Sequence, residues 1–440
     1  MKTKSASLAL TLALSLVPLQ SQAQGHVIKL MNHLQPYGFF RTTAVFDSRD
    51  SKTDVDDLFY CLPYDKEINL EGNDIHYNPS FKMSSATTRL GFNLTGFQYG
   101  SFNVTGKVEA DFTMLTDGTS ALRLREAYSD FAWDGLGMLV NFASVRVGHA
   151  WHPMSVDMPY GLGYEAGSPF NPYARSPQIM AEVGFLKHFS LTLGALYPSE
   201  NKPVGPSGTT DEYVRYGLIP EFYAGLTYRG KHVVAKVGAD FLSLVPRWRT
   251  TTTDDYSYDI GTKTTDRFYT INPMVYAEYS KGRFKVNAKG IFASGGDHLG
   301  LMGGYAVYKK NSAYDYEYTP LRSIVGFGSI SYGDQWQFRV YGGAMAALGS
   351  RHRLQTDYST GYAKTANIYY NSLGSMNINY IGRIAPSVVY NLENLSVGVE
   401  YNLTGVVYGD SDSMNSRGLA VNNKRLIFNH RVLAMVKYSF

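Results

Sequence analysis

The sequence has a single cysteine, Cys61, among 440 residues, so no disulfide bond can form within the chain. It has only 4 tryptophans, and beyond the N-terminal segment no apolar run reaches the roughly 18 to 20 residues of a transmembrane helix. Neither sign of charge dominates: 41 Lys and Arg stand against 37 Asp and Glu, which gives no indication of a nucleic-acid partner. Any membrane span must therefore use something other than a helix.

Tyrosine and glycine are abundant, with 35 and 43 residues. This composition is typical of a protein with many strands and interfacial aromatics. The first residues predict a signal peptide, because Lys2 and Lys4 precede an apolar run from Leu8 to Leu19 and Ser21-Gln22-Ala23 provides small residues for cleavage. We expect a signal peptide over residues 1–23, Sec-dependent export, and one mature domain over residues 24–440.

One unit recurs along the chain: an alternating strand, a very short turn, a second alternating strand and a long polar loop. Gly and Asp at turns such as Lys281-Gly282 and Gly333-Asp334 permit the left-handed backbone of tight hairpins. The pattern predicts an all-β fold, a transmembrane antiparallel β-barrel of about 16 strands with short periplasmic turns and long extracellular loops. The predicted outer loops are 47–84, 113–120, 150–174, 198–215, 246–266, 294–320, 349–374 and 409–425. A soluble β-sandwich is the alternative, but such long loops are hard to place in one.

The two faces of the strands differ. In residues 101–112, Phe102 and Val104 alternate with Asn103 and Thr105. A charge facing lipid costs roughly 2–4 kcal/mol at mid-bilayer, so the polar face must line the lumen. A lumen with many charges holds water, and a water-filled interior is a channel.

Basic residues outnumber acidic ones on the predicted lumen face, and a confined positive potential favours anions. The simpler interpretation is that they are solvated wall residues, partly paired with acids. The predicted lumen residues are Arg89, Lys107, Arg123, Arg125, Arg146, Lys236, Lys285, Lys289, Arg339, Arg383, Arg431 and Lys437, opposed by Glu109, Asp111, Asp240 and Glu400.

Glu126 breaks the alternation, because it falls on the face of Leu122 and Leu124. Either a β-bulge shifts the register at this point, or Glu126 lies near the membrane edge.

Four consecutive motifs resemble the N-terminal third of Gram-negative general and anion-type porins, including the DcaP-like group and porins of Bacteroidetes. They are Ser85–Phe92 (SATTRLGF), Gly106–Phe112 (GKVEADF), Leu122–Phe131 (LRLREAYSDF) and Val145–Pro153 (VRVGHAWHP). The ending from Asn429 to Phe440 resembles the closing strand of outer-membrane barrels. The resemblance implies a passive porin for small hydrophilic solutes in the outer membrane, in contact with the lipid bilayer and lipopolysaccharide.

The resemblance also implies three finer features. Porins of this kind fold the third outer loop into the barrel, which here is the Pro- and Gly-rich segment 150–174; Asp157 and Glu165 would then face Arg123, Arg125 and Arg146 across the pore. The terminal Phe440 would belong to the signal that the barrel assembly machinery reads. Family porins are commonly homotrimers.

Other chemistry finds little support. His149 and His152 are three residues apart and would face opposite sides of a strand, so we expect no metal site and interpret both as rim residues beside Trp151 in an aromatic girdle. No GxSxG, P-loop or HExxH motif is present, and we expect no cofactor and no catalytic residue. Two alternatives remain: an adhesin or receptor using long loops such as 47–84, and an outer-membrane phospholipase, for which no Ser partner of His430 is evident.

Overall fold

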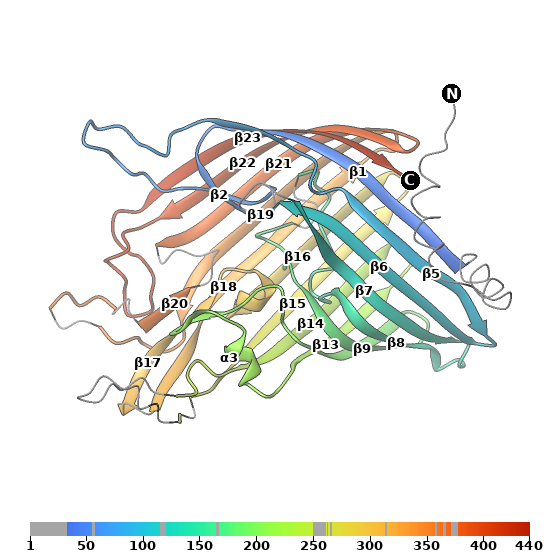
Figure 1. The fold of residues 1–440 in the computed structure, drawn as a ribbon, viewed down its shortest axis with the longest axis horizontal. Helices are drawn as coiled ribbons and strands as arrows, with labels where there is room; N and C mark the ends of the chain where they lie inside the picture. Colours follow the sequence, from blue (N-terminus) through green and yellow to red (C-terminus); the bar gives the residue numbers. More distant parts are fainter. Residues whose placement is uncertain are drawn as a thin grey trace, which may run out of the picture.

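The computed structural model describes residues 33–54, 58–114, 120–163, 167–249, 261, 263–264, 266–312, 315–356, 359–363, 367–370 and 377–440. Within these ranges, sixteen antiparallel strands close into a barrel (Figure 1). They are β1 (Leu34–Asp47), β5 (Arg89–Tyr99), β6 (Phe102–Met114), β7 (Ser120–Asp134), β8 (Val140–Trp151), β9 (Arg175–Phe185), β10 (Phe189–Leu196), β13 (Glu221–Arg229), β14 (Val233–Leu244), β15 (Phe268–Lys281), β16 (Phe284–Ser294), β18 (Asp315–Tyr332), β19 (Trp336–Ser350), β21 (Ile378–Leu392), β22 (Leu395–Tyr408) and β23 (Arg425–Ser439). The predicted fold class and strand number are confirmed.

The barrel closes where its two ends meet. β1 pairs with both β5 and β23, and Figure 1 shows β1 beside β23. The backbone N–H of Phe440 donates to the carbonyl of Gly38 at 3.0 Å, and the N–H of Gly38 donates to the carbonyl of Phe440 at 3.1 Å. A closed sheet leaves no unpaired edge in the hydrocarbon, which is the requirement for crossing a bilayer with strands.

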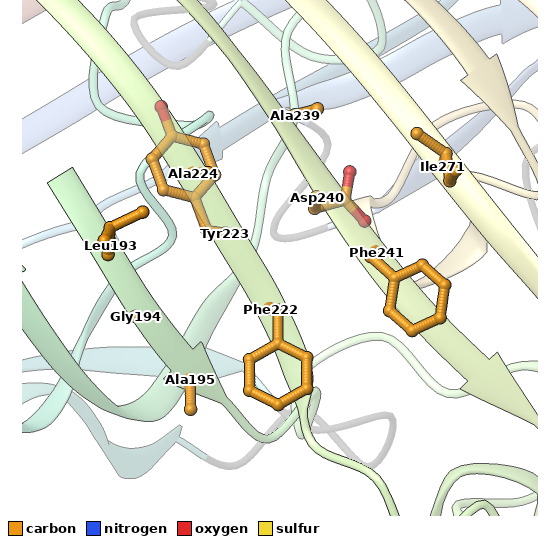
Figure 2. A pocket seen from close by; sticks show the side chains of 10 residues that line it. All are labelled: Leu193, Gly194, Ala195, Phe222, Tyr223, Ala224, Ala239, Asp240, Phe241 and Ile271. Atoms are coloured by element: carbon orange, nitrogen blue, oxygen red, sulfur yellow. The ribbon is translucent and has the colours of Figure 1, made fainter. Parts of the chain in front are cut away.

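The outer surface of the barrel is apolar. In β22, Val397, Val399 and Tyr401 are exposed while Glu400 and Asn402 are buried. A hollow of about 600 Å³ on this surface is lined by residues of β10, β13, β14 and β15, and Phe222 pairs there with Phe241 on the next strand (Figure 2). Exposed aromatics ring the end with the short turns: Tyr99, Trp133, Tyr228, Tyr279, Phe284, Tyr332, Trp336, Tyr438 and Phe440. The apolar surface and its aromatic ring place the protein in an outer membrane.

Shorter elements belong to the long loops. They are β2 (Ser51–Asp54), β3 (Phe59–Pro63), β4 (Ser80–Ser84), β11 (Val204–Gly205), β12 (Gly208–Thr209), α3 (Glu212–Arg215), the 3₁₀ turn η1 (Asp297–Leu299), β17 (Gly304–Ser312) and β20 (Ile368–Tyr370). No helix in the described ranges is long and apolar enough to span a membrane.

Two predicted boundaries were wrong. The outer loop predicted over residues 198–215 extends further, and the next strand, β13, begins only at Glu221, because Gly217 and Pro220 interrupt the extended pattern. The predicted loop 294–320 contains β17 and the first residues of β18, which form a hairpin beyond the barrel wall. In this hairpin, Tyr305 and Val307 alternate with small or polar residues, as apolar residues do in the barrel strands. The segment therefore pairs as two strands instead of forming the irregular loop that was predicted.

Candidate functional site: the barrel lumen

Most of the predicted third outer loop, residues 152–163 and 167–174, enters the barrel and crosses its interior. The contacts run from β16 to β1: Lys289 Nζ donates to the Met154 carbonyl at 2.7 Å, Asn287 Nδ2 to Met158 O at 2.9 Å, Arg339 Nη1 to Gly161 O at 3.2 Å, and Arg41 Nη2 to Leu162 O at 3.2 Å. On β22, the Glu400 carboxylate accepts from the backbone N–H of Leu162 at 2.8 Å. We call residues 152–163 and 167–174 the inserted segment; residues 164–166 lie outside the described part of the chain.

The sequence of the inserted segment suits this path. Its prolines fix φ, and its apolar side chains have a place to pack. Met154 and Phe170 are fully buried, and Leu162 packs against Leu433 of the last strand. Phe170 lies against Gly343 of β19, where any Cβ would overlap the phenyl ring. The wall is therefore complementary in shape to the segment.

A second part of the outer loops also packs inward. Tyr60, Cys61 and Leu62 of β3 are buried, the Arg383 guanidinium donates to the carbonyl of Tyr60, and the Tyr408 hydroxyl donates to that of Pro63 at 2.7 Å. Together with the inserted segment, β3 fills the lumen on the side of β21 and β22.

Eight of the twelve basic residues of the predicted lumen face form two groups. Those in the first group are buried and act as structural ties: Arg125, Lys289, Arg383 and Arg431. Arg383 Nη1 donates to Ser168 O at 3.0 Å, and Arg431 pairs with Asp47 at 2.7 Å. Lys289 donates to Asn171 Oδ1 at 2.6 Å in addition to the Met154 carbonyl. These charges bind protein groups and are not open to solutes.

The second group stays accessible along β5, β6, β7 and β8. The side chains of Arg89, Lys107, Arg123 and Arg146 are 28%, 24%, 28% and 36% exposed. Their acidic partners lie deeper: Glu109, Asp111 and Glu126 are only 7%, 5% and 6% exposed, and Asp130 is 25% exposed. We call these four basic residues the basic row.

The ion pairs of the basic row are close and directional. Arg123 makes a bidentate pair with Asp111 at 2.9 and 3.0 Å, and Arg146 makes one with Asp130 at 2.7 and 2.8 Å. Lys107 Nζ lies 2.9 Å from Glu126 Oε2. Bidentate geometry fixes the guanidinium planes, so the positive groups are held in place toward the lumen.

A β-bulge explains the irregular position of Glu126. Glu109 faces Glu126 and the next residue, Ala110, faces Leu124, so Arg125 is the extra residue in β7. The bulge alternative is thus confirmed. Arg125 and Glu126 are adjacent, yet both side chains point inward and are buried.

The other predicted site residues are placed differently. Asp157 pairs with Lys236 of β14 at 2.5 Å rather than with the arginines of β7 and β8, because that wall already supplies Asp111 and Asp130 as partners. Glu165 lies outside the described residues. Lys285 is exposed near a short turn, and Lys437 stacks over Phe39 at 4.4 Å.

The alternation of residues along the strands did not assign several acidic residues to the lumen face. Asp47 was assigned to a loop but ends β1 and pairs with Arg431; Glu126 and Asp130 follow the bulge, which reverses the alternation. The interpretation of His152 as a girdle residue was wrong: it is 1% exposed and its Nε2 lies 2.8 Å from Glu221 Oε1, because the chain turns into the barrel directly after Trp151.

A cavity of about 420 Å³ opens beneath the inserted segment. It is lined by wall residues of β6 to β14 together with Trp151, Pro153 and Val156. Charged groups of both signs face it, including Arg146 and Lys236, Asp130 and Glu182. A charged, water-accessible space below the segment continues the polar lumen toward the short turns.

A closed barrel with a segment folded across a charged lumen defines the porin class of folds. Among solved structures, the channel DcaP of Acinetobacter baumannii superposes with a TM-score of 0.63 at 16% identity, covering 92% of this chain and 97% of that one. OmpT of Vibrio cholerae gives 0.51 at 11% identity over 92% and 97%. An anion-selective porin from Comamonas acidovorans gives 0.50 at 11% over 92% and 99%. No family model matches the sequence, and no curated protein matches it.

These similarities show that the chain has the fold of Gram-negative outer-membrane porins, as the sequence motifs predicted. The similarities do not identify the solutes that pass through this protein, so these are inferred from the residues of its own lumen.

Proposed function

We propose that this protein is a passive diffusion channel for small hydrophilic solutes, with a preference for anions. The observation that carries the proposal is the basic row. Arg89, Lys107, Arg123 and Arg146 are accessible, whereas three of their four acidic partners are almost completely buried. A solute in the lumen meets the positive groups at shorter range than the negative ones, so the local potential favours anions.

The inserted segment supports the same proposal by directing solutes to that wall. It contacts the wall from β14 round to β1, β3 lies against β21 and β22, and the buried bases Lys289 and Arg383 hold both in place. The remaining path runs along β5 to β8. In this arrangement residues 150–174 are the pore-constricting loop, and Lys236 neutralises its Asp157.

The experiment is a reversal-potential measurement in a salt gradient across a planar bilayer. The wild type should favour anions. The variant Arg89→Gln/Arg123→Gln/Arg146→Gln retains the acids of the same wall and should lose this preference or favour cations. A matched control, Lys231→Gln/Lys281→Gln, removes exposed charges at the short turns and should match the wild type. Cation preference in the wild type would refute the anion proposal.

The remaining partners follow from the resemblance to porins. We propose a homotrimer, contact of the outer leaflet with lipopolysaccharide, and Phe440 as a residue that the assembly machinery reads. The predicted signal peptide over residues 1–23 lies outside the described residues.

The receptor alternative keeps one supporting observation. Residues 64–79 remain outside the barrel and expose Ile68, Leu70 and Tyr77. If folded protein inserts into a planar bilayer and no conductance is observed, that result would favour the receptor alternative. The phospholipase alternative is weaker, because the partner of His430 is a tyrosine: its Nδ1 lies 2.7 Å from the Tyr401 hydroxyl. We therefore propose a channel without enzymatic activity.

A further inference from the structure

Three metal-ligating side chains meet at the base of the inserted segment. Glu221 is the first residue of β13, Asp240 lies on β14, and His298 lies in the turn η1; Figure 2 shows Asp240 on its strand. One potential ligand atom from each lies within 4.8 Å of the others. All three side chains are at most 1% exposed.

The spacing of these atoms fits a single ion. His298 Nε2 lies 2.8 Å from Asp240 Oδ2 and 3.5 Å from Glu221 Oε1. Two ligands bound to zinc at about 2.0–2.1 Å with tetrahedral angles stand about 3.3 Å apart. The separations of 2.8 and 3.5 Å lie on either side of this value, and all three atoms lie within 4.8 Å of one another.

The cluster carries two carboxylates in a buried place. Among the described residues, no Lys or Arg forms an ion pair with Glu221 or Asp240, and the second oxygens of both, Glu221 Oε2 and Asp240 Oδ1, are buried without a hydrogen-bond partner. A buried charge needs a partner of opposite sign, and a buried oxygen needs a donor or a cation.

His152 does not supply that charge. Its Nδ1 accepts the backbone N–H of Met154 at 3.1 Å, so the ring proton is on Nε2, which donates to Glu221 Oε1 at 2.8 Å. The ring is therefore neutral. A proton on His298 would add one positive charge against two carboxylates, whereas a divalent cation bound to neutral His298 balances both.

We propose that Glu221, Asp240 and His298 bind one divalent transition-metal ion of the Zn²⁺ class. One imidazole and two carboxylates favour such an ion over Ca²⁺ or Mg²⁺, which prefer oxygen ligands only. His152 then acts as the outer group that orients the Glu221 carboxylate. The ion joins β13, β14 and η1, and His152 extends the connection to the base of the inserted segment.

The test is zinc stoichiometry on the full-length barrel. Wild-type protein is refolded in detergent with Zn²⁺, freed of unbound metal by gel filtration, and assayed for zinc by atomic emission, with folding checked by heat-modifiable gel mobility. We expect one zinc per folded chain, and a loss of most of it in Asp240→Asn and in His298→Gln. His430→Gln removes an exposed histidine from the outer surface and should retain the zinc.

Folded wild-type protein without bound zinc, or with zinc that Asp240→Asn retains, would overturn the proposal. The first result would mean that protons alone balance the cluster. If the variants fail to fold, the wild type still decides: refolding with Zn²⁺ should raise its unfolding temperature relative to refolding with a chelator. Equal temperatures together with no bound zinc would refute the site.

Discussion

Lys107 Nζ on β6 lies 2.9 Å from Glu126 Oε2 on β7, a contact that exists only because Arg125 is an extra residue in its strand. Without the bulge, Glu126 would face lipid, where a carboxylate is costly. The bulge therefore places one additional carboxylate, that of Glu126, behind the basic row. This negative charge lowers the positive electrostatic potential in the lumen.

Glu126→Gln should increase the preference for anions. The amide removes a negative charge behind Lys107, while Lys107 keeps a second contact with Glu109 at 3.5 Å. We expect the anion-to-cation permeability ratio to rise roughly two-fold, because the lumen potential grows with its uncompensated charge. Reversal potentials measure it; an unchanged or lower ratio would contradict the role of the basic row.

Lys289→Met should loosen the inserted segment. The substitution removes the hydrogen bonds that Lys289 donates to the Met154 carbonyl and to Asn171 Oδ1, and a buried acceptor left unsatisfied costs about 1–3 kcal/mol. We expect noisier single-channel currents and a lower temperature for the gel-mobility transition. Lys285→Met is the matched control, since Lys285 lies on the same face of β16 but is exposed. Equal noise in both variants would show that Lys289 does not hold the segment.

Gly343→Ala should displace Phe170 from the wall. A methyl group at this position overlaps the phenyl ring, so the inserted segment must shift, and overpacking of this kind typically costs about 1–3 kcal/mol. Single-channel conductance should change. Gly342→Ala, one residue earlier and on the opposite face, brings its Cβ no closer than 3.5 Å to the Arg383 carbonyl and should leave conductance unaltered. The same conductance in both variants would exclude a constriction by this segment.

Deletion of Phe440 should reduce assembly. Its backbone closes the barrel against Gly38, and its ring packs against Phe40 at 5.4 Å between centroids. We expect less heat-modifiable protein in the outer-membrane fraction, whereas Leu392→Ala, which removes an exposed side chain at a short turn, should assemble normally. Normal assembly of the variant that lacks Phe440 would show that this residue is not part of the signal that the assembly machinery reads.

The alternation of polar and apolar residues was enough to predict the barrel. Phe284 and Lys285, or Tyr438 and Lys437, lie on the faces that their parity indicates, because a strand has only two faces and lipid accepts only one kind of residue. The alternation also marked the irregularity at Glu126, although it could not choose between a bulge and a membrane edge.

The parts that could not be predicted depend on partners distant in sequence. Lys289 and Arg89 look alike in a strand pattern, yet one holds a loop and the other faces water, and only the path of the inserted segment separates them. The pairing of His152 with Glu221 joins residues 69 positions apart. No local signal distinguishes such a histidine from one on the rim of the barrel.

The proposed anion-preferring channel can be tested by measuring the current through single proteins in a planar bilayer with a KCl gradient. We expect steady open steps whose zero-current potential has the sign that shows a preference for anions, and we expect Arg89→Gln/Arg123→Gln/Arg146→Gln to lose that sign. A bilayer that stays closed with folded protein inserted would contradict the channel itself. Open steps with cation preference in the wild type would contradict the function assigned to the basic row.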